Sequence, residues 1–246
     1  MTTDPTAHPI AEEAPNRAWA LPGWLATVCR ALIVLALPVF LVLTGVRLVM
    51  SETFLELEYN RPGFPPDRYG FTQAERLRYA PYTVRYLLDN EDDDYLAALT
   101  HQGEPLFTER EVQHMRDVQA VTRAAFRVHS VAALVLLAAG LALGWRSENR
   151  RALRQGLFEG GVLTILLMLT AVVLVVANWD FFFTGFHRVF FEGDSWLFST
   201  RATLIRLFPE QFWFDAALAV GGLTFLGALS AILAALIWGR AARSAS

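Results

Sequence analysis

Apolar residues are gathered into four long runs, and polar residues fill the segments between them. The runs cover residues 24–50, 126–145, 157–178 and 211–238. A helix needs about 20 apolar residues to cross roughly 30 Å of hydrocarbon. The pattern therefore predicts four transmembrane helices.

The first run carries an arginine near each end, Arg30 and Arg47, around a clean apolar core at 31–46. Long arginine side chains reach the interface from such positions. The preceding residues, 1–23, hold one arginine against three acidic residues, and no small-residue cleavage site follows the run. We therefore expect a retained membrane anchor behind an N-terminal tail, not a cleaved signal peptide.

The segment 51–125 is too long for a simple connector, so we expect it to fold as a cap on the membrane. Two capping boxes, Thr72–Glu75 and Thr108–Glu111, predict helix starts within it. Pro81 is expected to bend or restart the first helix. Nothing interrupts the second before residue 126, which predicts one continuous helix from the cap into the membrane.

Composition agrees with this reading and excludes other classes. Hydrophobic residues make up 54% of the 246 and charged residues 18%, which excludes an ordinary soluble domain and a disordered chain. The net charge of -3 argues against a nucleic-acid partner. Cys29 is the single cysteine, so no disulfide framework is possible.

Arginine density predicts the orientation, because cytoplasmic loops are enriched in basic residues. The loop 146–156 carries four arginines and the tail 239–246 carries two. Both are placed in the cytoplasm, so 51–125 and 179–210 face outward. The predicted fold class is thus an all-α integral membrane protein with four transmembrane helices and a mostly helical extracytoplasmic cap.

The nucleophile-elbow, phosphate-loop, dinucleotide and zinc-protease motifs are absent from the sequence. The groups that titrate near neutral pH are then the five histidines. His8 lies in the N-terminal tail, His101 in a polar turn and His129 near the outer entry of a span, where structural roles are expected. His114 and His187 remain as candidates.

His114 lies in the second capped helix, with Glu111 three residues before it and Asp117 three residues after it. Either carboxylate is close enough along a helix to hold the imidazole and raise its basicity. A surface histidine on a charged helix face is the other reading of the same pattern.

His187 lies among many aromatic residues at the outer end of the third span. Such density indicates the wall of a pocket for an apolar ligand with a polar end, although a plain interfacial belt also fits. Ser195 has no base or oxyanion site in its motif, so we do not expect a nucleophile there. The residues expected to line an acyl pocket are Phe183, Phe186, Phe190, Phe191 and Trp196.

The strings Phe107-Thr-Glu-Arg-Glu-Val-Gln-His114-Met-Arg-Asp117 and Phe186-His187-x-x-Phe-Phe191 resemble the bacterial lipoprotein intramolecular transacylases. The resemblance extends from the first span through the fourth, and the acidic run 91–94 does not match it. It implies four transmembrane helices under an extracellular cap, in the bacterial cytoplasmic membrane. It also implies transfer of the sn-2 acyl chain of a diacylglyceryl lipoprotein to the amino group of its N-terminal cysteine.

The family's catalytic histidines carry over to His114 and His187. One histidine can act as base toward the amine and the other as acid toward the leaving alcohol, without a metal or other cofactor. The flanking carboxylates favour His114 as the base. Arg188 or Arg201 is a candidate for stabilising the oxyanion. The expected partners are the diacylated lipoprotein and membrane lipids, and the oligomeric state is open.

Two other classes fit the bare pattern of spans and histidines. Paired histidines on facing helices would indicate a b-type haem protein, although no two lie inside spans at matching depth. A non-catalytic membrane protein would use the aromatic segment only to bind lipid or another subunit.

Overall fold

The computed structural model describes residues 21–89 and 91–244. Most of the predicted N-terminal tail, including His8, lies outside the described residues. The elements are α1 (Gly23–Val49), α2 (Glu52–Asn60), α3 (Gln73–Leu88), α4 (Asp93–Ala97), β1 (Thr100–His101), β2 (Glu104–Pro105), α5 (Glu109–Gly144), the 3-10 turn η1 (Ser147–Asn149), α6 (Arg150–Ala177), α7 (Trp179–Phe190), α8 (Thr203–Leu207) and α9 (Glu210–Ser244).

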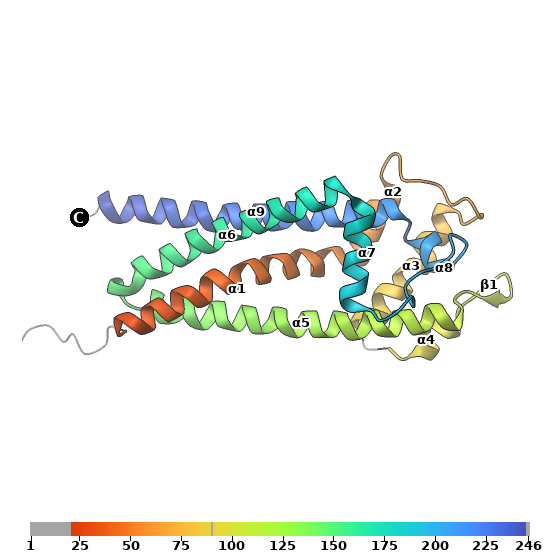
Figure 1. Cartoon of the computed structure of the whole chain (residues 1–246), viewed down its shortest axis with the longest axis horizontal. Coiled ribbons are helices and arrows are strands. Elements are labelled where there is room, and N and C mark those ends of the chain that lie inside the picture. Colours follow the sequence, from red (N-terminus) through yellow and green to blue (C-terminus); the bar gives the residue numbers. More distant parts are fainter. Residues whose placement is uncertain (1–20, 90, 245–246) are drawn as a thin grey trace, which may run out of the picture.

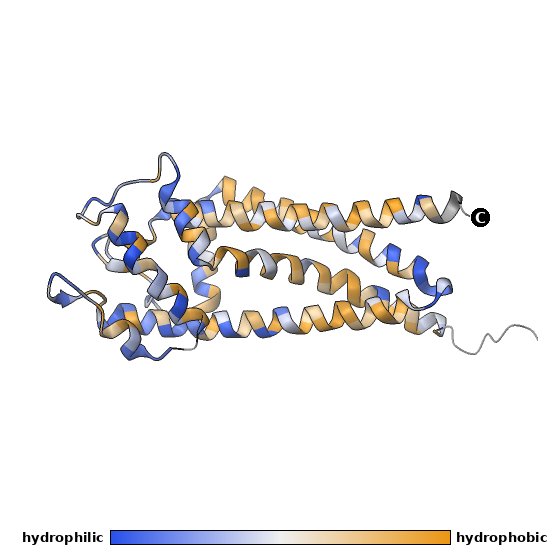
Figure 2. Ribbon diagram, turned by 180° about the vertical axis from the view of Figure 1, so that it is seen from behind, coloured by the Kyte–Doolittle hydropathy of each residue, from blue (hydrophilic) through white to orange (hydrophobic). Residues whose placement is uncertain are grey.

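Four long helices, α1, α5, α6 and α9, form an elongated bundle, and the shorter elements gather at one end of it (Figure 1). The bundle is apolar and the gathered end is polar (Figure 2). Each of the four helices is long and apolar enough to cross a membrane, and no more than 22% of its most apolar window is buried inside the protein, as expected for helices that face lipid. The prediction of an all-α membrane protein with four spans and a helical cap is confirmed.

Small residues let the spans approach one another closely. Helix α1 packs against α5, α6 and α9, and α6 also packs against α9. A Cβ atom at Gly161 would lie 2.9 Å from the carbonyl oxygen of Ala228 on α9, and one at Gly160 would lie 3.0 Å from Leu37 on α1. Helices in lipid associate through such close packing, because burial of apolar surface gives no driving force there.

Both predicted capping boxes are present, and α5 runs without interruption from the cap into the bundle, as predicted. Pro81 lies inside α3, however, and does not restart it. Proline in a helix interior costs about 3 kcal/mol. The buried side chains around it, Tyr79, Ala80, Thr83 and Tyr86, anchor α3 on both sides of the proline.

The acidic run at residues 91–94 ties the cap to α5. Asp93 forms an ion pair with Arg116. The side-chain amide of Gln119 donates to the carbonyl oxygen of Glu91 at 3.0 Å. The run that does not match the family pattern is thus part of the connection between α3, α4 and α5.

The outer segment 179–210 was expected as an aromatic-rich loop, but it contains two helices. The side chain of Asn178 accepts a hydrogen bond from the Phe181 backbone N–H at 2.9 Å and so caps α7. Helix α7 crosses the end of the bundle below the cap (Figure 1). At the other end of the chain, α9 continues to Ser244, through most of the expected tail.

Candidate active site

His114 lies near the start of α5 and is buried, with 9% of its surface exposed. Its imidazole meets two aromatic rings edge-on, Phe191 at 5.1 Å and Phe198 at 5.4 Å between centroids. Its Nδ1 atom is buried and has no hydrogen-bond partner among the described residues. The histidine predicted as a candidate is therefore enclosed by the aromatic segment and is not on a solvated helix face.

His187 lies on α7 and is half-buried. Its ring packs against Trp196 at 4.7 Å and against Phe183 at 4.2 Å between centroids. Its Nδ1 atom lies 2.8 Å from the carbonyl oxygen of Phe183. A carbonyl oxygen only accepts, so Nδ1 donates, and Nε2 of the neutral imidazole keeps its lone pair.

The fold brings the two histidines to one place although two spans separate them in sequence. The ring of Phe191 contacts both imidazoles, at 5.1 Å from His114 and 5.7 Å from His187. Protonation of His187 also disfavours protonation of His114, which requires the two groups to be electrostatic neighbours. We therefore treat the pair and its aromatic surround as the candidate active site.

Burial favours the neutral form of both imidazoles. It lowers the pKa of His114 to about 4, helped by repulsion from protonated His187 and opposed by the weaker attraction of Asp117. Burial also lowers the pKa of His187, with the hydrogen bond to the Phe183 carbonyl acting in the opposite direction. Of the two flanking carboxylates, Asp117 does raise the pKa of His114 as expected, but desolvation outweighs it, so the pKa of His114 is lowered overall.

Glu111 does not hold the imidazole of His114; its carboxylate has structural partners. One oxygen accepts from the backbone N–H and the hydroxyl of Thr108, each at 2.9 Å. The other accepts from the backbone N–H of Leu204 at 2.9 Å. Glu111 thus joins the start of α5 to the start of α8. Asp117 accepts a hydrogen bond from Gln113 at 3.1 Å.

The segment between α7 and α8 closes over the histidines and is fastened to α5. The guanidinium of Arg110 donates to the carbonyl oxygen of Asp194 at 2.7 Å and lies over the ring of Phe198. The hydroxyl of Thr203 donates to the carbonyl oxygen of Leu106, just before α5. Sequence reasoning missed the contact of Arg110 with this segment, because no local signal marks contacts between segments so far apart.

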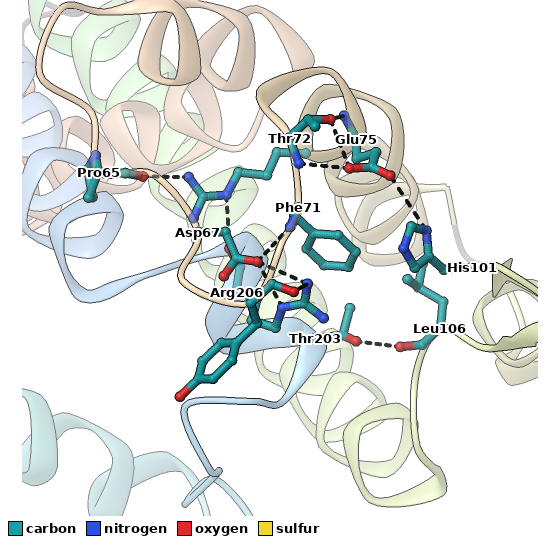
Figure 3. Close-up of polar contacts among 11 residues, drawn as sticks. Pro65, Asp67, Phe71, Thr72, Glu75, His101, Leu106, Thr203 and Arg206 are labelled. Atoms are coloured by element: carbon teal, nitrogen blue, oxygen red, sulfur yellow. Dashed lines mark hydrogen bonds and ion pairs between the residues drawn. The ribbon is translucent and has the colours of Figure 1, made fainter.

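Buried charges lock α8 into the cap (Figure 3). Arg206 pairs with Asp67 at 2.9 Å, and its guanidinium lies 3.6 Å from the centroid of the Phe71 ring. Asp67 also accepts from the backbone N–H of Phe71 at 2.8 Å. Burial raises the pKa of Asp67, but these hydrogen bonds and the charge of Arg206 lower the pKa more. The segment between α7 and α8, which covers the histidines and is called the covering segment below, is therefore anchored at its α8 end.

The expected acyl-pocket residues fall into two sets. Phe183, Phe191 and Trp196 pack around the histidines. Phe186 and Phe190 instead line a groove of about 240 Å³ on the other side of α7. The α7 groove is lined by Leu174, Phe181, Phe182, Gly185, Phe186, Val189 and Phe190.

The two candidate arginines lie outside the aromatic surround. Arg188 is exposed on α7. Arg201 is exposed too, and its guanidinium lies 5.2 Å from the centroid of the Tyr69 ring in the cap. In the described structure neither forms a hydrogen bond with His114 or His187. The hydroxyl of Ser195 donates to the carbonyl oxygen of Glu192 at 3.4 Å.

His129 is accounted for within the bundle. Its Nε2 lies 2.9 Å from the hydroxyl of Thr44, and its ring stacks on Phe40. Of the histidines that the structure describes, it is the one that lies within a predicted span, whereas bis-histidine haem ligation needs two facing each other. Across residues 21–89 and 91–244, no three His, Cys, Asp or Glu side chains are grouped to hold a metal ion.

Known proteins resemble this chain in sequence and in structure. A family model for the lipoprotein intramolecular transacylase Lit matches residues 31–213. An uncharacterized protein of Aquifex aeolicus is 34% identical over 181 residues, which cover 73% of this chain and 80% of that one.

Solved structures of Lit from Bacillus cereus have the same fold. One superposes with a TM-score of 0.75 at 18% identity, covering 91% of this chain and 100% of that chain. A variant of that protein with one histidine replaced by alanine superposes with a TM-score of 0.70 at 18% identity, covering 90% and 97%.

Proposed function

The chain belongs to the lipoprotein intramolecular transacylase family, and from this premise we propose that it transfers the sn-2 acyl chain of a diacylglyceryl lipoprotein to the α-amino group of the N-terminal cysteine. The amine nitrogen attacks the ester carbonyl, the nitrogen loses a proton, and the glyceryl oxygen leaves with one. The products are an amide and a free hydroxyl on the glyceryl group. The observation that carries the proposal is the meeting of His114 and His187 against Phe191.

His187 is the base in this scheme. The hydrogen bond from its Nδ1 to the Phe183 carbonyl leaves the Nε2 lone pair free to accept the amine proton. The same hydrogen bond stabilises the imidazolium that forms. The imidazolium then donates its Nε2 proton to the departing glyceryl oxygen, so one histidine serves both proton transfers.

His114 is the neutral donor to the carbonyl oxygen. With a pKa of about 4 it stays uncharged at neutral pH. Its buried, unpartnered Nδ1 fits the tautomer that carries the proton on Nε2, because an unfilled lone pair is easier to bury than an unpaired N–H. A neutral imidazole whose lowered pKa keeps it a hydrogen-bond donor polarises carbonyls in other enzymes. This assignment differs from the sequence-based prediction that His114 is the base.

The location of the histidine site in the fold supports a lipoprotein substrate. The acyl esters of a membrane-anchored lipoprotein lie at headgroup level, and α7 crosses the bundle where the spans meet the polar cap (Figures 1 and 2). The arginine-rich α5–α6 connection and the end of α9 lie at the opposite end (Figure 1). We place that end in the cytoplasm and the cap outside.

Mass spectrometry of a lipoprotein co-expressed with the protein tests the activity. The expected product carries an N-acyl group on its cysteine and one ester-linked chain on the glyceryl group. Recovery of the unchanged diacyl form alone would contradict the proposal. If wild-type protein and both histidine variants all leave the diacyl lipoprotein unchanged, a non-catalytic lipid-binding role is favoured.

A further inference from the structure

Gly185 stands in the middle of α7 without a structural reason for being glycine. Glycine is a poor helix former, second only to proline. The backbone at Gly185 is helical and does not have a positive φ. A Cβ atom there would meet no atom within 4 Å, so close packing does not require glycine either. What lies beside Gly185 is the open space of the α7 groove.

The α7 groove occupies the face of α7 that is turned away from the histidines. Phe181, Gly185 and Val189 recur every four residues along this face, and Phe182, Phe186 and Phe190 form the adjoining row. The lining is almost wholly apolar. An apolar cavity of about 150 Å³ holds a benzene molecule, so the 240 Å³ groove has room for several methylenes.

Phe186 is the residue that lies between the groove and the reaction centre. At one side the groove is bounded by Leu174, an exposed residue of the span α6. At the other it is bounded by Phe186, whose ring meets the His187 ring edge-on at 5.6 Å. A chain with its ester carbonyl beside His187 would reach the groove by passing over Phe186.

We propose that the α7 groove holds the acyl chain that is transferred, and that Gly185 sets how long a chain it accepts. This inference rests on the proposed function. Phe186 and Phe190 then contact the chain, while Phe183, Phe191 and Trp196 enclose the reacting groups. Gly185 is a specificity-determining residue because any side chain at its position projects into the space for the methylenes.

The test compares Gly185→Leu with wild type on two synthetic diacylglyceryl lipopeptides in proteoliposomes. Both carry palmitoyl at sn-1, and they carry either palmitoyl or hexanoyl at sn-2. A leucine side chain displaces about three methylenes, each worth a factor of about four when buried. The palmitoyl-to-hexanoyl ratio of the rates should fall by up to roughly 60-fold relative to wild type, with hexanoyl transfer retained.

Gly222→Leu is the matched control. Gly222 lies exposed on the span α9, and a Cβ atom there also meets nothing within 4 Å. It should leave the ratio at the wild-type value. Gly185→Ala should shift the ratio in the same direction by a smaller amount, and it decides the question if the leucine variant does not fold.

An unchanged palmitoyl-to-hexanoyl ratio in both Gly185 variants overturns the inference. Failure of the wild type to convert either lipopeptide would count against the proposed function itself. A diazirine near the end of the sn-2 chain gives a second measurement. Its crosslinks should fall on α7, and crosslinks confined to α1 or α5 would overturn the inference.

Discussion

Nδ1 of His187 donates a hydrogen bond to the carbonyl oxygen of Phe183, one helical turn earlier on α7, across 2.8 Å. This contact fixes which ring nitrogen carries the proton in the neutral imidazole. Nδ1 of His114 has no such partner among the described residues. The contact fixes Nδ1 of His187 as a donor, whereas no such contact fixes the tautomer of His114, and the proposed function uses this difference to separate a base from a donor.

Replacing His187 with Gln should abolish measurable transfer. The change removes the base and the acid together, and each proton transfer contributes roughly 100- to 10,000-fold. N-acyl product from a purified diacyl lipopeptide, measured by mass spectrometry, is the readout. Ser195→Ala serves as the control and should retain nearly full activity. An acyl group trapped on Ser195 would contradict direct transfer.

Replacing His114 with Gln should be less damaging than replacing it with Ala. Gln keeps an N–H donor near the carbonyl, whereas Ala removes it, and loss of one oxyanion donor costs roughly 100- to 1,000-fold. The comparison uses single-turnover rates of the two variants in the same vesicles. Equal and complete loss in both would favour a proton-transfer role for His114.

On acidification, the rate should fall less than it does in an enzyme whose histidine base has an ordinary pKa. Burial lowers the pKa of His187 below 6.5, so its base form is retained as the pH falls through 6.5 and is lost only below that. Activity should rise further toward pH 8, because the α-amino group of the substrate has a pKa of about 7.7 to 8.0. With the ionisation of the substrate amine accounted for, a further ionisation of the enzyme above pH 6.5 in the pH–rate profile would contradict this assignment.

Replacing Glu111 with Gln should destabilise the protein and slow acyl transfer. Glu111 is 1% exposed, and its two oxygens accept from both Thr108 and Leu204. A Gln amide nitrogen would face a backbone N–H, and such an unsatisfied buried donor costs about 1–3 kcal/mol. Thermal unfolding in detergent measures the change. Glu109→Gln, in the exposed first turn of α5, is the control and should unfold as wild type does.

Replacing Asp67 with Asn should loosen the covering segment. It leaves the partly buried Arg206 guanidinium without its charge partner (Figure 3), and breaking a fully buried pair costs about 3–5 kcal/mol, which is the upper limit here. Limited proteolysis should cut between α7 and α8 faster than in wild type. Unaltered cleavage there would show that the contacts of Arg110 and Thr203 alone hold the segment.

Sequence alone determined the spans, the two capping boxes and the continuous α5. These features depend on the residues within one segment and on their spacing, which can be read without neighbours. The capping-box residue Glu111 shows the limit of such reading. Its local partner Thr108 follows from the motif, but its second partner, Leu204, belongs to a segment beyond the third span.

Only the tertiary structure decided the surroundings and the protonation of each histidine. Sequence named His114 and His187, and local carboxylates pointed to His114 as the base. Packing against Phe191 and Phe198 removed His114 from water, and desolvation lowers a pKa more than a nearby charge on the same helix raises it. Burial and long-range contacts set the protonation of the histidines, and the spacing of residues along the chain predicts neither.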